Sequence, residues 1–289
     1  MKLYYFKDHK GNFGDDLNPW LWNKLLPDFF DDDNREIFVG IGTLINHRLP
    51  ETPIKHIFGS GYGYGKLPKI DNRYIFHAVR GYKTAQLLGV PKEKVITDSA
   101  ILIRTVNLAP YTRPKEYKFG LMLTGHSLEM YNGWKKICDN LNFNYISCHW
   151  NVEKVLGEIS ACEVLITEAM HGAIVADALR IPWLPVDFYN NILSLKWEDW
   201  LSSIELPFVH NRLQSLYNKD QSIKMRLKRL IFKKDQQPHY STKNDIEKTT
   251  QELLRVSKTH PFLSQDALLA TLTDKYLDLL YKIRLDIYK

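Results

Sequence analysis

The chain has 289 residues, of which 44% are hydrophobic and 25% charged, a composition typical of a folded globular protein and not of a disordered one. Its length predicts two domains of ordinary size. The net charge is +6. No apolar run reaches the roughly 18 residues that a membrane-spanning helix needs.

The three cysteines, Cys138, Cys148 and Cys162, lie in segments expected to be helix or strand. An odd number of cysteines without a Cys-x-x-Cys pair argues against both a disulfide framework and a zinc site. The first residues, Met-Lys-Leu-Tyr-Tyr-Phe, lack the apolar run of a secretory signal. We therefore expect a cytoplasmic protein that holds no metal.

Short apolar strands alternate with helices through the first part of the chain. Strands are expected at residues 3–6, 37–41, 55–58, 74–79 and 94–97. Helices are expected near residues 18–26 and over residues 83–88, where Gly89 ends the second helix. Short apolar strands between helices indicate a parallel sheet covered by helices.

A polar segment with two prolines, residues 107–117, interrupts this alternation and is the best candidate for a linker. After it, strands are expected at residues 119–123, 145–148, 164–166 and 183–186. Helices are expected at residues 128–141, at 152–159 and from His171 onward. The remainder of the chain reads as helical, most clearly over residues 245–256 and 263–287.

This order of elements predicts an α/β fold with two Rossmann-like lobes that face a cleft. Residues 1–110 form the first lobe, residues 111–205 the second, and residues 206–289 a helical carboxy-terminal extension. In open sheets of this type, ligands bind beyond the carboxyl ends of the strands. The loops at those ends therefore hold the candidate site.

Three such loops in the first lobe are polar or rich in glycine. Residues 11–19 contain Gly14 and place Asp15 just before a helix, residues 58–65 carry a glycine at every second position, and Arg80 with Gly81 follows the fourth strand. Backbone N–H groups and a guanidinium in these loops can bind a phosphate or carboxylate. The alternatives are a helix-capping aspartate, a flexible hairpin and a surface arginine.

In the second lobe, the strand at 164–166 leads through a polar turn into the helix that opens at His171 and Gly172. Thr167, Glu168 and His171 are thereby brought to one helix N-terminus, where free N–H groups and the helix dipole favour an anion. A histidine beside a carboxylate at such a point suits proton transfer on a phosphate ester. The alternative is that both side chains only cap the helix.

Several short motifs occur in the order in which one known family carries them. They are Asn12-Phe-Gly-Asp15, Gly40-Ile-Gly-Thr43, Gly59-Ser-Gly61, Val79-Arg-Gly81, Asp98-Ser99, Glu168-Ala-Met-His-Gly-Ala-Ile-Val-Ala-Asp-Ala-Leu179 and Lys196-Trp-Glu-Asp-Trp200. The chain resembles the polysaccharide pyruvyl transferase family over roughly residues 1–205. It resembles the Glu-x-x-His-Gly branch, because Ala169 stands where many members carry an arginine.

The resemblance implies a GT-B-like two-lobed fold. It also implies transfer of the enolpyruvyl group of phosphoenolpyruvate onto a sugar of a cell-surface polysaccharide or its lipid-linked precursor, forming a pyruvate ketal without a cofactor. We expect His171 to act in catalysis, with Asp15 or Glu168 as its partner. The expected substrate-binding residues are Arg80, Gly14, Gly59, Ser60, Gly61, Gly81 and Gly172.

Two alternatives to a pyruvyl transferase stay open at this point. A sugar-nucleotide-dependent glycosyltransferase could use the same scaffold, since fold does not fix function. Such an enzyme usually has a basic pair beside a ribose-binding carboxylate, and no basic pair stands next to Glu168 in the sequence. The third reading is a non-catalytic scaffold that binds sugars or membranes.

The positive charge is concentrated in the segment 224–234, which contains no acidic residue. A partly amphipathic basic helix there can contact the anionic inner face of a membrane. The alternatives are a solvated face or a tether to nucleic acid; we expect no nucleic-acid partner. The basic residues are Lys224, Arg226, Lys228, Arg229, Lys233 and Lys234.

Overall fold

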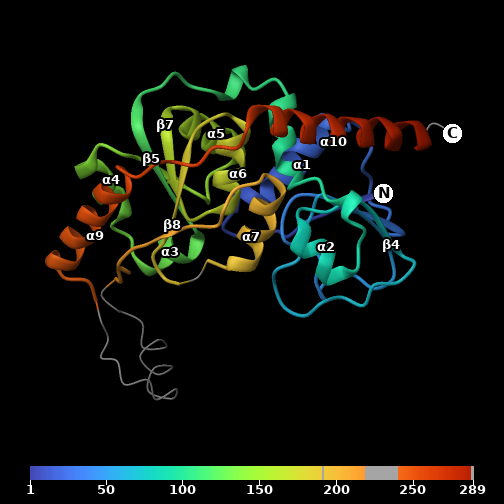
Figure 1. Cartoon of the computed structure of the whole chain (residues 1–289), viewed down its shortest axis with the longest axis horizontal. Coiled ribbons are helices and arrows are strands. Elements are labelled where there is room, and N and C mark those ends of the chain that lie inside the picture. Colours follow the sequence, from blue (N-terminus) through green and yellow to red (C-terminus); the bar gives the residue numbers. More distant parts are fainter. Residues whose placement is uncertain (191, 219–239, 288–289) are drawn as a thin grey trace, which may run out of the picture.

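A computed structural model of the chain describes residues 1–190, 192–218 and 240–287 (Figure 1). The predicted membrane-contact segment, residues 224–234, lies outside the described residues. Within the described residues the chain forms two parallel β-sheets and the helices that cover them. The predicted α/β class, with parallel strands alternating with helices, is therefore confirmed.

The first sheet has the strand order β1-β2-β3-β4, and each strand pairs in parallel with the next. Its strands are β1 (Lys2–Tyr4), β2 (Glu36–Val39), β3 (Ile54–Phe58) and β4 (Tyr74–Ala78). Helix α1 (Phe13–Leu25) follows β1, and helix α2 (Tyr82–Leu88) follows β4. Gly89 ends α2 in the left-handed conformation, as its position predicted.

The second sheet has the order β6-β5-β7-β8-β9 and is also parallel throughout. Its strands are β5 (Tyr117–Leu123), β6 (Asn144–Ser147), β7 (Cys162–Thr167), β8 (Trp183–Asp187) and the two-residue β9 (Asn211–Arg212). The helices between them are α3 (Gly125–Met130), α4 (Trp134–Leu141), α5 (Val152–Ser160), α6 (Met170–Ala178) and α7 (Ser194–Ser203). The chain leaves β5 to one side for β6 and returns on its other side for β7, so the order reverses at β5.

Figure 1 shows α1, α6 and α7 between the two sheets. Helix α1 contacts α5 and α6, and α2 contacts α7. One buried cluster includes Phe38 and Phe58 of the first sheet together with Ile146 and Leu165 of the second. The two sheets thus share a hydrophobic core, while the division into lobes at residue 110 stays a prediction.

Three expected elements differ in the structure. The helix expected near residues 18–26 begins already at Phe13, so Asp15 lies in its first turn and not before it. The strand expected at 94–97 is a single bridge between Val79 and Val95 that follows the 3₁₀ helix η1 (Lys92–Lys94). The backbone of Val79 bonds Lys94 and Ile96, and the chain then turns into the 3₁₀ helix η2 (Ser99–Thr105). The helix expected at 128–141 is split into α3 and α4, with Gly133 as the N-cap of α4.

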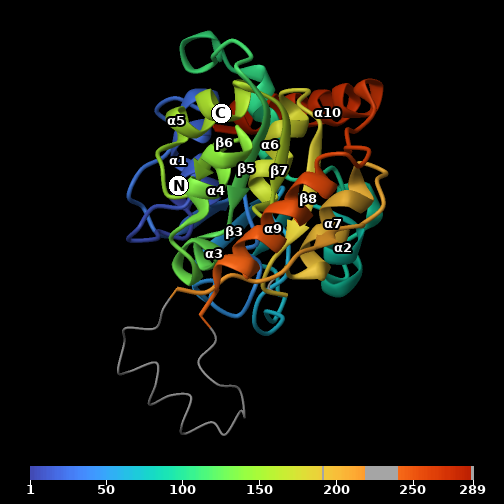
Figure 2. The same cartoon turned by 90° about the vertical axis from the view of Figure 1, so that its left-hand side faces the viewer.

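The carboxy-terminal helices pack against different sheets. Helix α9 (Lys243–Val256) contacts α4 beside the second sheet, as Figures 1 and 2 show. Helix α10 (Asp266–Ile287) crosses to the first sheet, where Tyr276 packs on Phe58 and its hydroxyl donates a hydrogen bond to the carbonyl of Thr97. Among the described residues, no helix combines the length and apolarity needed to cross a bilayer.

Candidate active site

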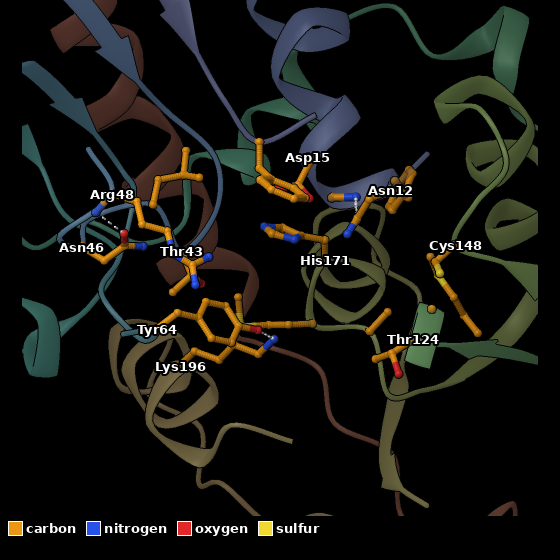
Figure 3. A pocket seen from close by; sticks show the side chains of 18 of the residues that line it. Asn12, Asp15, Thr43, Asn46, Arg48, Tyr64, Thr124, Cys148, His171 and Lys196 are labelled. Atoms are coloured by element: carbon orange, nitrogen blue, oxygen red, sulfur yellow. Dashed lines mark hydrogen bonds between the residues drawn. The ribbon is translucent and has the colours of Figure 1, made fainter. Parts of the chain in front are cut away.

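A cavity of about 390 Å³ lies between the two sheets, at the carboxyl ends of their strands (Figure 3). Loops of both sheets line it: Phe6 follows β1, Arg48 follows β2, Tyr64 follows β3, Thr124 follows β5, Cys148 follows β6 and His171 follows β7. Its size is ordinary for a small-molecule pocket, which spans roughly 300–1,000 Å³. The pocket also lies beside β5, where the strand order reverses, as expected for an open parallel sheet.

The side chain of His171 stands at the centre of this pocket, on the first turn of α6. It is 15% exposed. The ring lies against Gly14 of α1, and a Cβ atom on residue 14 would overlap Nδ1 of the ring. A glycine at this position therefore lets the N-termini of α1 and α6 approach each other, and the free N–H groups and dipoles there favour a bound anion.

Asp15 lines the same pocket from α1. Burial raises the pKa of its carboxyl from the ordinary 3.8 to about 6; the nearby His171 opposes this shift and Asp16 adds to it. A carboxyl group with such a pKa exists in both protonation states near neutral pH, which suits a general acid or base. Asp15 and His171 thus line the same pocket, whereas the sequence had left Asp15 and Glu168 open as partners of the histidine.

The second acidic neighbour of His171 is Asp98, which immediately precedes η2 and is fully buried. Its Oδ2 lies 3.6 Å from Nε2 of the ring. In the sequence Asp98 belongs to a family motif, but nothing there places it beside a histidine more than seventy positions away.

Two cationic side chains line the pocket. In Figure 3 they lie on the side of His171 away from Cys148 and Thr124. Arg48 comes from the loop after β2, and Lys196 comes from α7, where its Nζ donates a hydrogen bond of 2.9 Å to the hydroxyl of Tyr64. Sequence reasoning missed both as pocket-lining residues. Lys196 was part of a family motif without an assigned role, and Arg48 carried no signal beyond its place after a strand.

Arg80 does not line this pocket and is fully buried. Its Nε donates to Asp199 Oδ2 at 2.9 Å, Nη1 donates to the hydroxyl of Thr43 at 2.7 Å, and Nη2 donates to the carbonyl of Tyr62 at 3.0 Å. All three nitrogens are therefore used within the protein. The position at a strand end was read correctly, but the partner carboxylate on α7 could not be seen from the sequence.

Glu168 is also buried and lies outside the pocket lining. One of its carboxylate oxygens accepts the backbone N–H of Phe188 at 2.9 Å, and the other accepts from the Ser127 hydroxyl and from Thr124. Burial raises the pKa of this carboxyl above its ordinary value. Glu168 thus ties together the ends of β5, β7 and β8, so Asp15, not Glu168, shares the pocket with His171.

The remaining expected binding positions, apart from Gly14, are points of close packing outside the pocket lining: Gly59, Ser60, Gly61, Gly81 and Gly172. A Cβ atom on Gly61 would overlap the Arg80 guanidinium, and one on Gly81 would overlap the carbonyl of Asp199. Gly59 has φ of +92° and lies directly against Tyr276 of α10. These glycines make room for tertiary contacts that hold the pocket loops.

Comparisons with known proteins show which family the chain belongs to. Residues 11–188 match the family model described as Polysaccharide pyruvyl transferase. The chain is also similar to the succinoglycan biosynthesis protein ExoV of Rhizobium meliloti (strain 1021), with 38% identity over 216 residues that cover 74% of this chain and 68% of that protein. The chain belongs to the polysaccharide pyruvyl transferase family. The family expected from the sequence motifs is confirmed.

In this member of the pyruvyl transferase family, the pocket thiol is not a candidate nucleophile. Burial raises the pKa of Cys148 to about 12, so the thiol stays protonated near neutral pH, and the thiolate is the reactive form. Across the described residues, His, Cys, Asp and Glu side chains form no group of three that could hold a metal ion. Asp15 and His171 are the carboxyl and imidazole side chains that line the pocket.

Proposed function

We propose that the protein transfers the enolpyruvyl group of phosphoenolpyruvate to a sugar and closes it to a pyruvate ketal. The acceptor is a cell-surface polysaccharide or its lipid-linked precursor, in keeping with the relative that is named for succinoglycan biosynthesis. The observation that carries this proposal is one pocket in which Asp15 and His171 face two cationic side chains. We propose further that the two sheets act as the lobes of a GT-B-like enzyme.

The donor has two anionic groups, a phosphate and a carboxylate, and the pocket offers two kinds of partner for them. Arg48 and Lys196 supply positive charge from the first sheet and from α7. The adjoining N-termini of α1 and α6 supply N–H groups and favourable dipoles. In this proposal Arg48 and Lys196 take the anion-binding role that the sequence had suggested for Arg80, whose nitrogens are engaged elsewhere.

The proposed reaction has two steps. A sugar hydroxyl adds to C2 of phosphoenolpyruvate, its proton is removed, and a proton is delivered to C3 to form a methyl group. A second hydroxyl of the sugar then replaces the phosphate at C2, losing its proton, and inorganic phosphate leaves. In this proposal Asp15 accepts the proton of the hydroxyl and delivers a proton to C3, while His171 assists the departing phosphate.

Exposed aromatic side chains at the pocket provide a surface for the acceptor. Phe6 is 55% exposed and Tyr64 is 46% exposed, although both line the pocket. Aromatic faces of this kind suit the apolar faces of sugar rings, and the hydroxyl of Tyr64 adds a polar contact. The predicted cytoplasmic location and membrane contact of residues 224–234 stay predictions.

The test is incubation of the purified protein with phosphoenolpyruvate and a panel of free and lipid-linked glycans. We expect phosphate release that depends on the glycan, and a product that carries a pyruvate ketal in its mass spectrum. The variant His171→Ala should lose at least about 10²-fold in kcat, since general acid–base help gives roughly 10²–10⁴-fold. Near-normal turnover in a folded variant would contradict the role of His171.

A binding measurement separates this proposal from sugar-nucleotide transfer. A ligand at about 100 times its Kd stabilises a protein by about 2.7 kcal/mol, which thermal denaturation detects. We expect phosphoenolpyruvate to raise the melting temperature and sugar nucleotides to leave it unchanged. The opposite pattern would exclude the proposed donor.

A further inference from the structure

Asp98 contacts His171 without lining the pocket. Its carboxylate is fully buried, and Oδ1 accepts a hydrogen bond of 3.0 Å from the backbone N–H of Ala100. The other oxygen, Oδ2, faces Nε2 of His171 across 3.6 Å. Both facing atoms are enclosed, and neither has a hydrogen-bond partner within the described part of the chain.

We propose that Asp98 is a positioning residue that keeps the proton of the neutral His171 ring on Nε2. An enclosed carboxylate oxygen and an enclosed ring nitrogen are each costly alone, but they satisfy each other when the nitrogen carries a proton. The distance of 3.6 Å is longer than a formed hydrogen bond. Contacts of this kind are often long without substrate and shorten in the reacting complex.

The other titratable groups near this pair are either open to the ligand or bonded elsewhere. Asp15 also faces His171, but it lines the pocket and can meet a ligand directly. Lys196 lies across the pocket, where its Nζ bonds Tyr64. Tyr276 of α10 lies beside Asp98, but its hydroxyl donates to the carbonyl of Thr97.

Fixing the proton on Nε2 has a consequence for catalysis. The lone pair then resides on Nδ1, the ring nitrogen left for exchange with a ligand, and the Asp98 carboxylate stabilises the imidazolium once Nδ1 gains a proton. The same pairing fixes the ring plane against Gly14. This inference deepens the proposed function, since the proton that His171 handles is the one in the transfer reaction.

The first test uses NMR of isotope-labelled ring nitrogens in the intact protein without substrate. In the wild type we expect the neutral His171 ring to carry its proton on Nε2. The variant Asp98→Asn should lose this preference, because an amide can donate to the ring as well as accept from it. A wild-type ring with its proton on Nδ1 would overturn the proposal, and this measurement does not depend on the variant folding.

A matched control is Asp177→Asn. Asp177 lies on α6, like His171, and its side chain is buried like that of Asp98. Its carboxylate, however, accepts hydrogen bonds from Trp183 and Ser264. This change should lower stability and leave the ring proton of His171 in place. If Asp177→Asn moves the ring proton as far as Asp98→Asn does, a general loosening explains the effect and the proposal fails.

The second test is kinetic. Asp98→Asn should lower kcat by about 10²-fold or more, with KM for phosphoenolpyruvate nearly unchanged because Asp98 does not touch the ligand. A folded Asp98→Asn variant with wild-type kcat would overturn the proposal. The ring-proton measurement needs no reaction, so absence of pyruvyl transfer in the wild type would reject the proposed function and leave Asp98 as the partner of His171.

Discussion

Asp15 holds its carboxyl group where the charged form is disfavoured. Its pKa of about 6 in the folded protein lies above the ordinary 3.8. Between these values the folded state binds more protons than the unfolded state, so the free energy of unfolding falls as the pH rises through this window. The shift corresponds to about 3 kcal/mol near neutral pH, which partial exposure of the side chain reduces to about 1–2 kcal/mol.

The neutral variant Asp15→Asn removes this cost. Near neutral pH we expect urea denaturation to show it about 1–2 kcal/mol more stable than the wild type, with the difference vanishing below about pH 4. Pyruvyl transfer should fall at the same time. The control Asp32→Asn changes an exposed aspartate and should leave both properties unchanged. A destabilised Asp15→Asn near neutral pH would show that the charged form is favoured by the fold.

The residues of the site differed in how far the sequence could predict them. Asp15 and His171 each stand just inside a helix that follows a strand, so local pattern alone brought both to the pocket. Glu168 and Arg80 also stand at strand ends, but their partners lie on other elements and turn them into buried structural contacts. Side-chain direction at such a point depends on tertiary packing, which periodicity does not encode.

At the scale of elements, the pocket depends on the approach of α1 to α6. Gly14 is the contact point, and any Cβ atom there would overlap Nδ1 of His171. We expect Gly14→Ala to stay folded but to displace the histidine ring, lowering kcat by about 10²-fold, as misplacement by about 1 Å can do. A crystal structure of the variant would show the shifted ring.

The matched control for this change is Gly157→Ala on helix α5. The nearest atom to a Cβ there is the Tyr111 carbonyl oxygen at 3.3 Å, far from the pocket. This variant should keep wild-type turnover, with stability close to that of the wild type because alanine favours a helix. Equal losses of activity in both variants would argue against a specific contact at Gly14.

Most helices and strands followed from alternation of apolar and polar segments, because the strands are buried between helices. The expected strand at 94–97 failed for a physical reason. Val95 pairs with Val79 at one bridge only, and the turn into η2 at Asp98 leaves no length for a ladder. In the expected helix at 128–141, the break comes at Gly133, which is costly inside a helix and is used as the N-cap of α4.

At the scale of the whole molecule, the ion pair of Arg80 and Asp199 joins the end of β4 to α7. Both side chains are almost fully buried. Removing one partner of such a pair typically costs about 3–5 kcal/mol, because it leaves a buried charge, whereas replacing both by apolar groups costs less. The double variant Arg80→Met with Asp199→Leu should therefore lose less stability than the sum of the single changes.

Denaturation of the two single variants and the double variant measures this coupling, which we expect at about 0.5–3 kcal/mol. The half-exposed pair Lys83–Glu198 links α2 to α7 close by and serves as a control. Its coupling should be about 0–1 kcal/mol, as for most surface ion pairs. Equal coupling in both pairs would mean that burial does not strengthen the Arg80–Asp199 contact.

The return of α10 to the first sheet has a consequence for how the molecule is made. Tyr276 bonds the carbonyl of Thr97 over a separation of 179 positions, and it covers Phe58. A ribosome must therefore release the chain beyond Tyr276 before this contact can form. Until then Phe58 of the nascent first sheet lacks its cover, so consolidation of this sheet waits for the synthesis of helix α10.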